Sequence, residues 1–170
     1  KGKTLAVTLK GTGFHYALLA NLRKAGLNDG DYTIVELRRP AMTPALKDGR
    51  VDLVMIGPPT LYAIEAKVKT KRIFTPEDAM GDVQALVLVG RTKFLKDNPE
   101  AMKDFMEDYI IGLTWFLDPK NRDEAIKITA KFGKSPAKFY EAFAFSKKDF
   151  YHNPTATPNI TALQRNIDLM

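Results

Sequence analysis

The sequence predicts an α/β fold, with a doubly wound and mostly parallel sheet followed by a helical C-terminal region. The first observation behind this prediction is the alternation of short β-branched segments with helical segments over residues 1–75. The second is that the links between these segments are short, which favours right-handed crossovers and parallel pairing. The third is that apolar residues beyond residue 91 recur only at helical spacing.

Each element of the first part has its own local signal. Strands are predicted at 5–9, 32–37, 51–56 and 71–74, and helices at 14–25, 41–47 and 60–67. Gly26 follows the first helix, between Leu22 and Leu27, in the pattern of a Schellman motif, so that helix is predicted to end there. Pro59 suits the first turn of the third helix.

The second part is predicted to be helical after one apolar strand. Residues 75–82 and 151–159 are predicted as loops, and residues 84–90 as a strand. Segments with helical spacing are predicted as helices at 99–117, 119–132, 136–145 and 160–170. Asn98 is expected to cap the first of these, with Pro99 in its first turn. The apolar stripe of that helix is expected to pack in a core.

Composition restricts the classes of function. The chain of 170 residues carries 26 Lys and Arg against 20 Asp and Glu, a net charge of +6, with two His and no Cys. The lack of Cys excludes disulfides and thiolate metal sites, and it fits an extracytoplasmic bacterial protein. The densest basic patch, residues 67–72, is short and has no aromatic residues to stack on bases, so no nucleic-acid partner is predicted. No apolar run approaches the roughly 20 residues that span a membrane.

The candidate ligand site lies where the predicted parallel strands end. Ligands of open α/β sheets bind outside the carboxyl ends of the strands, and the loops at 10–14, 38–42 and 57–60 follow those ends. The first loop opens a helix, whose free N–H groups and positive dipole end favour an anion. The candidate ligand-binding residues come from these loops and from the first helical turn: Thr12, Gly13, His15, Arg38, Arg39, Gly57 and Pro58.

Most of these candidates have two interpretations. Thr12 and Gly13 offer a hydroxyl and amides to an oxyanion, or they only begin the helix. His15 hydrogen-bonds a ligand, or it packs as a neutral imidazole, because the helix dipole disfavours its charged form. Arg38 and Arg39 bind a carboxylate or sulfonate in bidentate fashion, or they are an exposed surface pair.

Gly57 and Pro58 shape a cleft, or they simply end the third strand.

Signals for catalysis are missing from the sequence, which has no Cys, no G-x-S-x-G and no H-E-x-x-H. Asp52 and Glu65 show no sequence partner that would make an acid–base pair. We therefore predict a protein that is not an enzyme, with no catalytic residues, no metal site and no cofactor.

Several segments, taken in order, resemble one family of proteins. Residues 1–15 contain KGKTLAV and GTGFH, similar to a KGKxIAV…GSxxH opening. Residues 45–52, ALKDGRVD, are similar to ALxxGxVDA, and residues 87–105 are similar to a strand and helix written lVaRkdFlkenPeavkaf. Residues 162–168, ALQRNID, resemble a C-terminal helix. The chain thus resembles the solute-binding proteins of ABC transporters, of the nitrate/sulfonate/taurine type with the type II periplasmic-binding fold.

This resemblance implies a division of the chain, because two lobes of that fold are joined by hinge strands and clamp the ligand. Residues 1–83 would be an α/β ligand-binding lobe, 84–90 a hinge strand, and 91–170 a helical region of the other, incomplete lobe. Since the first strand begins so near Lys1, an N-terminal segment is expected to be missing. Many relatives have an aromatic and an acidic residue where this chain has Ile56 and Gly57, which removes a negative charge here.

The resemblance also implies a function. The protein would be the extracytoplasmic solute-binding component of an ABC importer, which captures a small anionic organic solute by lobe closure. The solute class would be sulfonate, nitrate or aromatic carboxylate, and the other partner an ABC permease in the membrane. The location would be the periplasm or the extracellular face, with lipid anchoring and self-association of the chain left open. Two alternatives share this fold: a pyrimidine-precursor synthase-like enzyme, which would need His15 or His152 in a metal cluster, and the effector domain of a transcription regulator.

Overall fold

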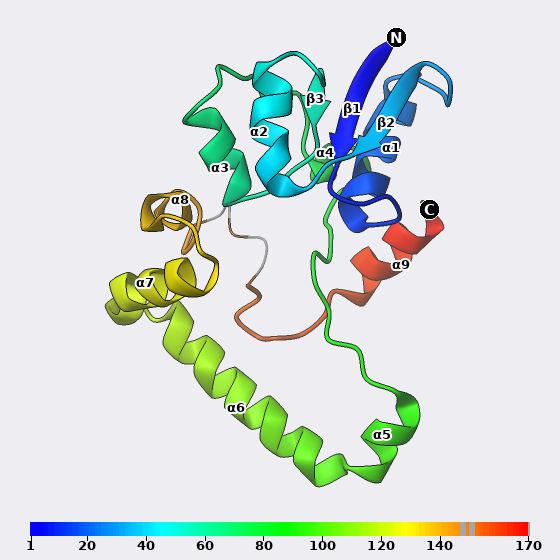
Figure 1. Cartoon of the computed structure of the whole chain (residues 1–170). Coiled ribbons are helices and arrows are strands. Elements are labelled where there is room, and N and C mark those ends of the chain that lie inside the picture. Colours follow the sequence, from blue (N-terminus) through cyan, green and yellow to red (C-terminus); the bar gives the residue numbers. More distant parts are fainter. Residues whose placement is uncertain (147–148, 150–151, 170) are drawn as a thin grey trace. The chain divides into compact units, whose positions relative to one another are not determined.

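The computed structural model describes residues 1–146, 149 and 152–169, and the chain divides into two units. Unit 1 comprises Lys1–Val83 and Asn159–Met170, and unit 2 comprises Gln84–Pro158. Figure 1 labels the helices and strands of both units. Tyr151 and Met170, at the limits of a predicted loop and of the last predicted helix, lie outside the described residues.

Unit 1 contains a parallel sheet whose strands are separated by helices. Its elements are β1 Lys3–Val7, α1 Gly13–Lys24, β2 Tyr32–Glu36, α2 Arg39–Lys47, β3 Leu53–Val54, α3 Thr60–Glu65, α4 Pro76–Met80 and α9 Ile160–Asp168. The strand order is β2-β1-β3, and Leu5 of β1 is paired in parallel with Ile34 on one side and Leu53 on the other. The predicted parallel α/β arrangement is confirmed.

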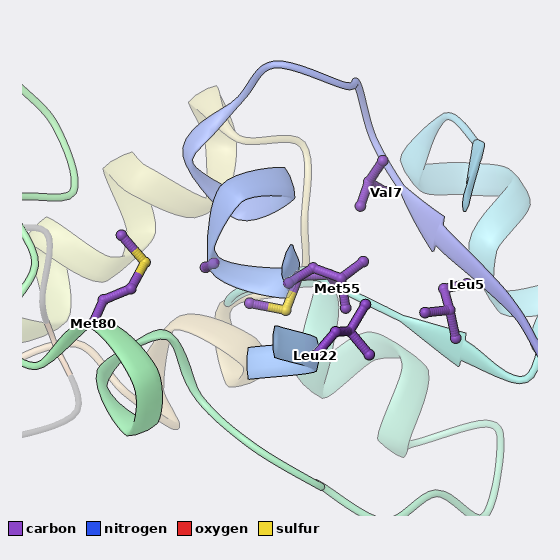
Figure 2. Close-up of a cluster of buried hydrophobic side chains, with 7 residues drawn as sticks. Leu5, Val7, Leu22, Met55 and Met80 are labelled. Atoms are coloured by element: carbon purple, nitrogen blue, oxygen red, sulfur yellow. The ribbon is translucent and has the colours of Figure 1, made fainter. Parts of the chain in front are cut away.

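Helices cover both faces of this sheet, as a doubly wound fold requires. Side chains alternate along β1, so Leu5 and Val7 lie on one face and Ala6 on the other. Leu5 and Val7 pack in one buried cluster with Leu22 of α1, which Figure 2 shows. Ala6 packs in a second cluster with Ala45 of α2. The crossovers that contain α1 and α2 therefore pass over opposite faces.

The predicted end of α1 is confirmed in detail. The Leu27 N–H donates to the Leu22 carbonyl at 2.9 Å, and the Gly26 N–H donates to the Arg23 carbonyl at 2.9 Å. These are the two bonds of a Schellman motif, and they require a left-handed residue between them. Gly26 adopts φ +74°, a conformation that costs a residue with a Cβ free energy.

Two predicted strands, 71–74 and 84–90, do not form within the described residues. Residues 84–90 are apolar and residues 71–74 end in Ile73 and Phe74, but a strand also needs a neighbour for its N–H and C=O groups. β2 and β3 are the edges of the described sheet, and neither segment pairs with them. Leu88, for example, is 70% exposed. The predicted strand at 84–90 is therefore wrong, whereas its role as a hinge stays a prediction.

Residues 75–82 contain α4 rather than only a loop, because Thr75, Pro76 and Asp78 form a helix start that the prediction missed. The Thr75 N–H donates to the Asp78 carboxylate, as in a capping box, and Pro76 occupies the first helical position. The Asp78 carboxylate also accepts from the Thr75 hydroxyl at 3.0 Å. The bond from the Thr75 N–H lowers the pKa of Asp78 most, and the bond from the hydroxyl lowers it further.

Helix α9 belongs to unit 1, whereas the sequence analysis assigned residues 91–170 together to another lobe. The Arg165 guanidinium donates to the Asp82 carbonyl. A Cβ on Gly81 would lie 3.1 Å from the Arg165 Cζ atom, so the glycine leaves room for this contact. Ala162 is also buried. These contacts attach the end of the chain to unit 1.

Unit 2 is helical. It contains α5 Thr92–Asp97, α6 Pro99–Leu117, the 3₁₀ helix η1 Pro119–Asn121, α7 Arg122–Phe132 and α8 Ala137–Glu141. Helix α6 begins at Pro99 as predicted, but the Asn98 side chain donates to the Phe94 carbonyl at 2.9 Å instead of capping α6. On the apolar stripe of α6, Leu113 is buried, whereas Phe105, Met106, Tyr109 and Ile110 are exposed. Among the described helices, none has both the length and the apolar character that a membrane span needs.

Candidate functional site

The loops that follow β1, β2 and β3 leave the sheet at the same edge. The Leu37 N–H donates to the Val7 carbonyl at 2.9 Å, and the Met55 N–H donates to the Ala6 carbonyl at 2.9 Å. The ends of the three strands are thus in register across the sheet. We call the loops at 8–12, 37–38 and 55–59, together with the start of α1, the carboxyl edge. In parallel α/β sheets this is the edge where ligands bind.

The start of α1 presents unused hydrogen-bond donors at this edge. The Tyr16 N–H donates to the Thr12 carbonyl at 3.0 Å, which begins the helical pattern. The N–H groups of Gly13, Phe14 and His15 precede it, and no acceptor for them is found among the described residues. The Thr12 hydroxyl donates to the Leu9 carbonyl at 2.8 Å, so its oxygen remains able only to accept. The donors available for an anion are therefore the amides, not this hydroxyl.

His15 is held as a neutral imidazole. The Gly11 N–H donates to His15 Nδ1 at 3.1 Å, so Nδ1 is the acceptor and Nε2 carries the ring proton. Partial burial lowers the pKa of His15, the Lys10 charge lowers it further, and Glu36 opposes the shift. At neutral pH the ring is uncharged and offers one N–H donor. The two interpretations of His15 from the sequence are compatible, since a neutral ring still hydrogen-bonds.

Glu36 is a polar group at this edge that the sequence analysis missed. Its carboxylate accepts the Lys10 N–H at 2.7 Å, which fixes the first loop against the end of β2. Glu36 is exposed and close enough to His15 to affect the pKa of its ring. The signal that could have revealed it is its position as the last residue of an otherwise apolar strand. The carboxyl edge therefore holds a negative charge as well as donors.

The two arginines occupy different surroundings. Arg38 precedes α2, and its carbonyl accepts the Ala41 N–H at 2.9 Å. Arg39 lies in α2 and faces a depression of about 630 Å³ between α2 and α3. Neither arginine forms an ion pair within the part of the chain that the structure describes. The residues that line this depression are Arg39, Pro40, Thr43, Pro44, Lys47, Thr60, Ala63 and Lys67.

Gly57 and Pro58 are half-buried and connect β3 to α3. The Gly57 carbonyl accepts the Leu61 N–H at 3.1 Å, and the bond between Pro58 and Pro59 is cis. The structure thus brings Gly57 and Pro58 to the carboxyl edge as predicted, without showing a ligand contact. Within the described residues, no three His, Asp or Glu side chains are grouped as ligands for a metal ion.

Comparison with known proteins identifies the family of the chain. A profile of the family described as NMT1/THI5 like matches residues 1–121. The chain belongs to the NMT1/THI5-like family. It is also similar to the taurine-binding periplasmic protein of Escherichia coli (strain K12), with 33% identity over an alignment of 139 residues that covers 75% of this chain and 42% of that protein.

A solved structure shows the same fold. The zinc-bound ligand-binding component of an ABC-type import system from Staphylococcus aureus superposes with a TM-score of 0.76 and 18% sequence identity. The superposition covers 99% of this chain and 56% of that chain. The chain therefore spans about half the length of the relatives it matches. The names of both relatives describe binding components.

Proposed function

We propose that this NMT1/THI5-like protein is the extracytoplasmic solute-binding component of an ABC importer, and that its carboxyl edge binds a small anionic organic solute. The observation that carries the proposal is the row of unused N–H groups on Gly13, Phe14 and His15. Backbone amides at a helix start, reinforced by the helix dipole, are a common binding site for oxyanions. The family and the named relatives support the transport role.

The polar groups around these amides favour a sulfonate among the predicted solutes. Three amides and the Nε2–H of neutral His15 would donate to the three oxygens of a sulfonate. A taurine-like solute also carries an ammonium group, and the exposed Glu36 carboxylate would attract it. Nitrate and aromatic carboxylates would use the same amides but would leave Glu36 without a positive partner. Arg38, beside the Glu36 strand end, would add a further positive charge for the anionic group.

The remaining parts of the proposal follow from the coverage of the relatives. Residues 84–90 would act as a hinge, and unit 2 would belong to a second lobe that closes over the solute. Many convergent polar contacts from both lobes are needed for tight binding, so unit 1 alone would bind weakly. The delivery partner would be an ABC permease, and the location would be outside the cytoplasmic membrane.

Substitution of Gly13 tests the proposal at the amides. Gly13→Pro removes one N–H, and proline is favoured at the first position of a helix, so α1 should persist. Gly13→Ala is the matched control, because it keeps the N–H and a Cβ there would meet no atom within 4 Å. Binding of taurine and ethanesulfonate would be followed by ¹⁵N NMR shifts of the amides at the start of α1.

We expect Gly13→Pro to weaken sulfonate binding about tenfold or more, since it removes a hydrogen bond to a charged group, and Gly13→Ala to change it little. Choline, a cation of similar size, should cause no shifts. Equal binding by the wild type and Gly13→Pro would reject the amides as the site. Shifts caused by nitrate or benzoate but not by sulfonates would keep the site and change the solute class.

A further inference from the structure

The depression between α2 and α3, which we call the basic groove, is lined by none of Thr12, His15 and Gly57. Only Arg39 is common to the basic groove and to the candidate ligand residues. Both helices belong to unit 1 and lie side by side in Figure 1. The basic groove is therefore a second candidate binding surface in the same unit, and it needs a separate explanation.

The shape of the basic groove follows from helical spacing. Arg39, Thr43 and Lys47 succeed one another at intervals of four residues, so they form one row along α2. The opposite side of α2 contains Ala45, which is buried. The lining includes two short side chains, Thr43 from α2 and Ala63 from α3, and Thr43 lies between Arg39 and Lys47 in the row on α2. Cations stand at its ends.

Acidic side chains near the basic groove are already paired elsewhere. The Glu65 carboxylate at the end of α3 accepts from Arg72 through Nε at 2.7 Å and Nη2 at 2.8 Å. Asp48, directly after α2, lies 3.6 Å from the Arg50 guanidinium. Neither acid lines the basic groove. The carboxylates nearest to the basic groove in the sequence are therefore paired with arginines outside the basic groove.

The basic groove thus contains three cationic side chains, Arg39, Lys47 and Lys67, and no acidic side chain is part of its lining. None of them forms an ion pair with another described residue. Like charges around a concave surface repel one another and concentrate anions there. The interaction is felt over the Debye length, about 8 Å at physiological salt, which is comparable with the width of a groove between helices.

The length of the basic groove narrows the choice of anion. Arg39 and Lys47 are eight residues apart on α2, which corresponds to about 12 Å along the helix axis. A single sulfonate or nitrate would meet only one end. An extended peptide with Glu at every second position places carboxylates about 6.6 Å apart on one side, so it would reach both ends. The Thr43 and Thr60 hydroxyls between the ends would hydrogen-bond such a backbone.

We propose that the basic groove binds an extended acidic peptide segment of a partner protein. The proposal shares only Arg39 with the candidate ligand residues, and the two lysines that the test changes lie outside that set. The probe is a fluorescein-labelled peptide Gly-Glu-Gly-Glu-Gly-Glu-Gly, with the same peptide carrying Gln for Glu as the uncharged control. Binding would be measured by fluorescence anisotropy in 50 mM and 500 mM NaCl.

Two double variants separate a site from general attraction to a basic protein. Lys47→Gln with Lys67→Gln removes two charges from the basic groove and leaves Arg39 in place. Lys127→Gln with Lys131→Gln removes two charges from the exposed face of α7 and is the matched control. Sulfonate-induced amide shifts at the start of α1, measured on both variants, show whether the carboxyl edge is intact.

We expect the Glu peptide to bind in 50 mM NaCl, the Gln peptide not to bind, and the Lys47/Lys67 variant to bind about tenfold more weakly than the control variant. NMR shifts on addition of the Glu peptide should centre on Thr43, Thr60 and Ala63. Equal weakening in the two double variants would overturn the proposal, because it would show non-specific attraction. Citrate that binds in the basic groove as tightly as the peptide would also overturn it, in favour of a small polycarboxylate. A Lys47/Lys67 variant that binds the Glu peptide as tightly as the control variant would contradict the groove proposal, even if that variant had lost sulfonate binding.

Discussion

Units 1 and 2 differ in what covers their apolar side chains. In unit 1, Leu18 of α1 and Met42 of α2 are both 0% exposed, because each helix packs on one face of the sheet. In unit 2, Phe105 and Ile110 on the apolar stripe of α6 are 47% and 45% exposed, although α6 is the longer helix. The comparison teaches that apolar spacing is enough to predict a helix and its apolar face. Burial of that face requires a second surface, which unit 1 has in its sheet.

The largest expected effect comes from comparing truncation of a buried side chain in unit 1 with truncation of an exposed one in unit 2. Leu18→Ala should lower the free energy of unfolding by about 3 kcal/mol, because it leaves a cavity between α1 and the sheet. Ile111→Ala should change it by no more than about 0.5 kcal/mol, since the side chain is already exposed. Urea unfolding followed by circular dichroism measures both. A cost at Ile111 as large as that at Leu18 would show that the side of α6 that carries Ile111 is covered in solution.

Two glycines sharpen the comparison at the level of the backbone. Gly26→Ala should lower the free energy of unfolding by about 1–2 kcal/mol, because a Cβ disfavours φ +74°. Gly112→Ala, inside α6, should raise it by about 0.8 kcal/mol, since alanine is the better helix former. A Cβ would meet no atom within 4 Å at either position, so packing does not enter. Thermal melts of both variants should move in opposite directions.

Two asparagines compare the helix starts of the two units. The Asn159 side chain accepts the Ala162 N–H at 2.9 Å and caps α9, whereas Asn98 makes no such bond to α6. Asn159→Ala should therefore lower the free energy of unfolding by about 1 kcal/mol. Asn98→Ala should change it by a few tenths, as for other positions that do not cap. Urea midpoints would decide; a larger loss at Asn98 would mean that its side chain caps α6 in solution.

The smallest expected effect is on the stability of unit 1 at acidic pH. The Lys3 side chain and then the Thr4 N–H hydrogen-bond to Asp52, and both lower the pKa of this carboxyl below 3.8. A lowered pKa contributes stability that is present above the unfolded pKa of 3.8 and is lost as the pH falls through the folded value. Unit 1 should therefore lose stability below pH 3.8, and Asp52→Asn should reduce that dependence.

The control for this acid effect is Asp104→Asn in α6, a carboxylate for which no ion pair is found among the described residues. Unfolding midpoints measured at pH 3 and pH 6 would be compared for the two variants. An unchanged pH dependence in Asp52→Asn would show that the bond to Lys3 does not persist in solution.

Local chemistry is what the sequence by itself determined about this protein. Three predicted features are present in the structure: the Schellman end of α1, the start of α6 at Pro99 and the parallel alternation of unit 1. The signals for them come from residues within a few positions of one another. The carboxyl edge could also be foreseen, because parallel strands with short crossovers must end together. The family resemblance, carried by short motifs in order, agrees with the match to the NMT1/THI5-like family.

Contacts between distant residues were decided only by the tertiary structure. Residues 84–90 have the composition of a strand, yet strand formation depends on a partner for the backbone, and no described strand lies beside them. The attachment of α9 to unit 1 depends on Arg165 reaching the Asp82 carbonyl, 83 residues away. The placement of Glu36 beside Lys10 and His15, and of Arg39 in the basic groove, likewise arises from packing between elements. Sequence spacing describes one element at a time, whereas a binding surface is made where several elements meet.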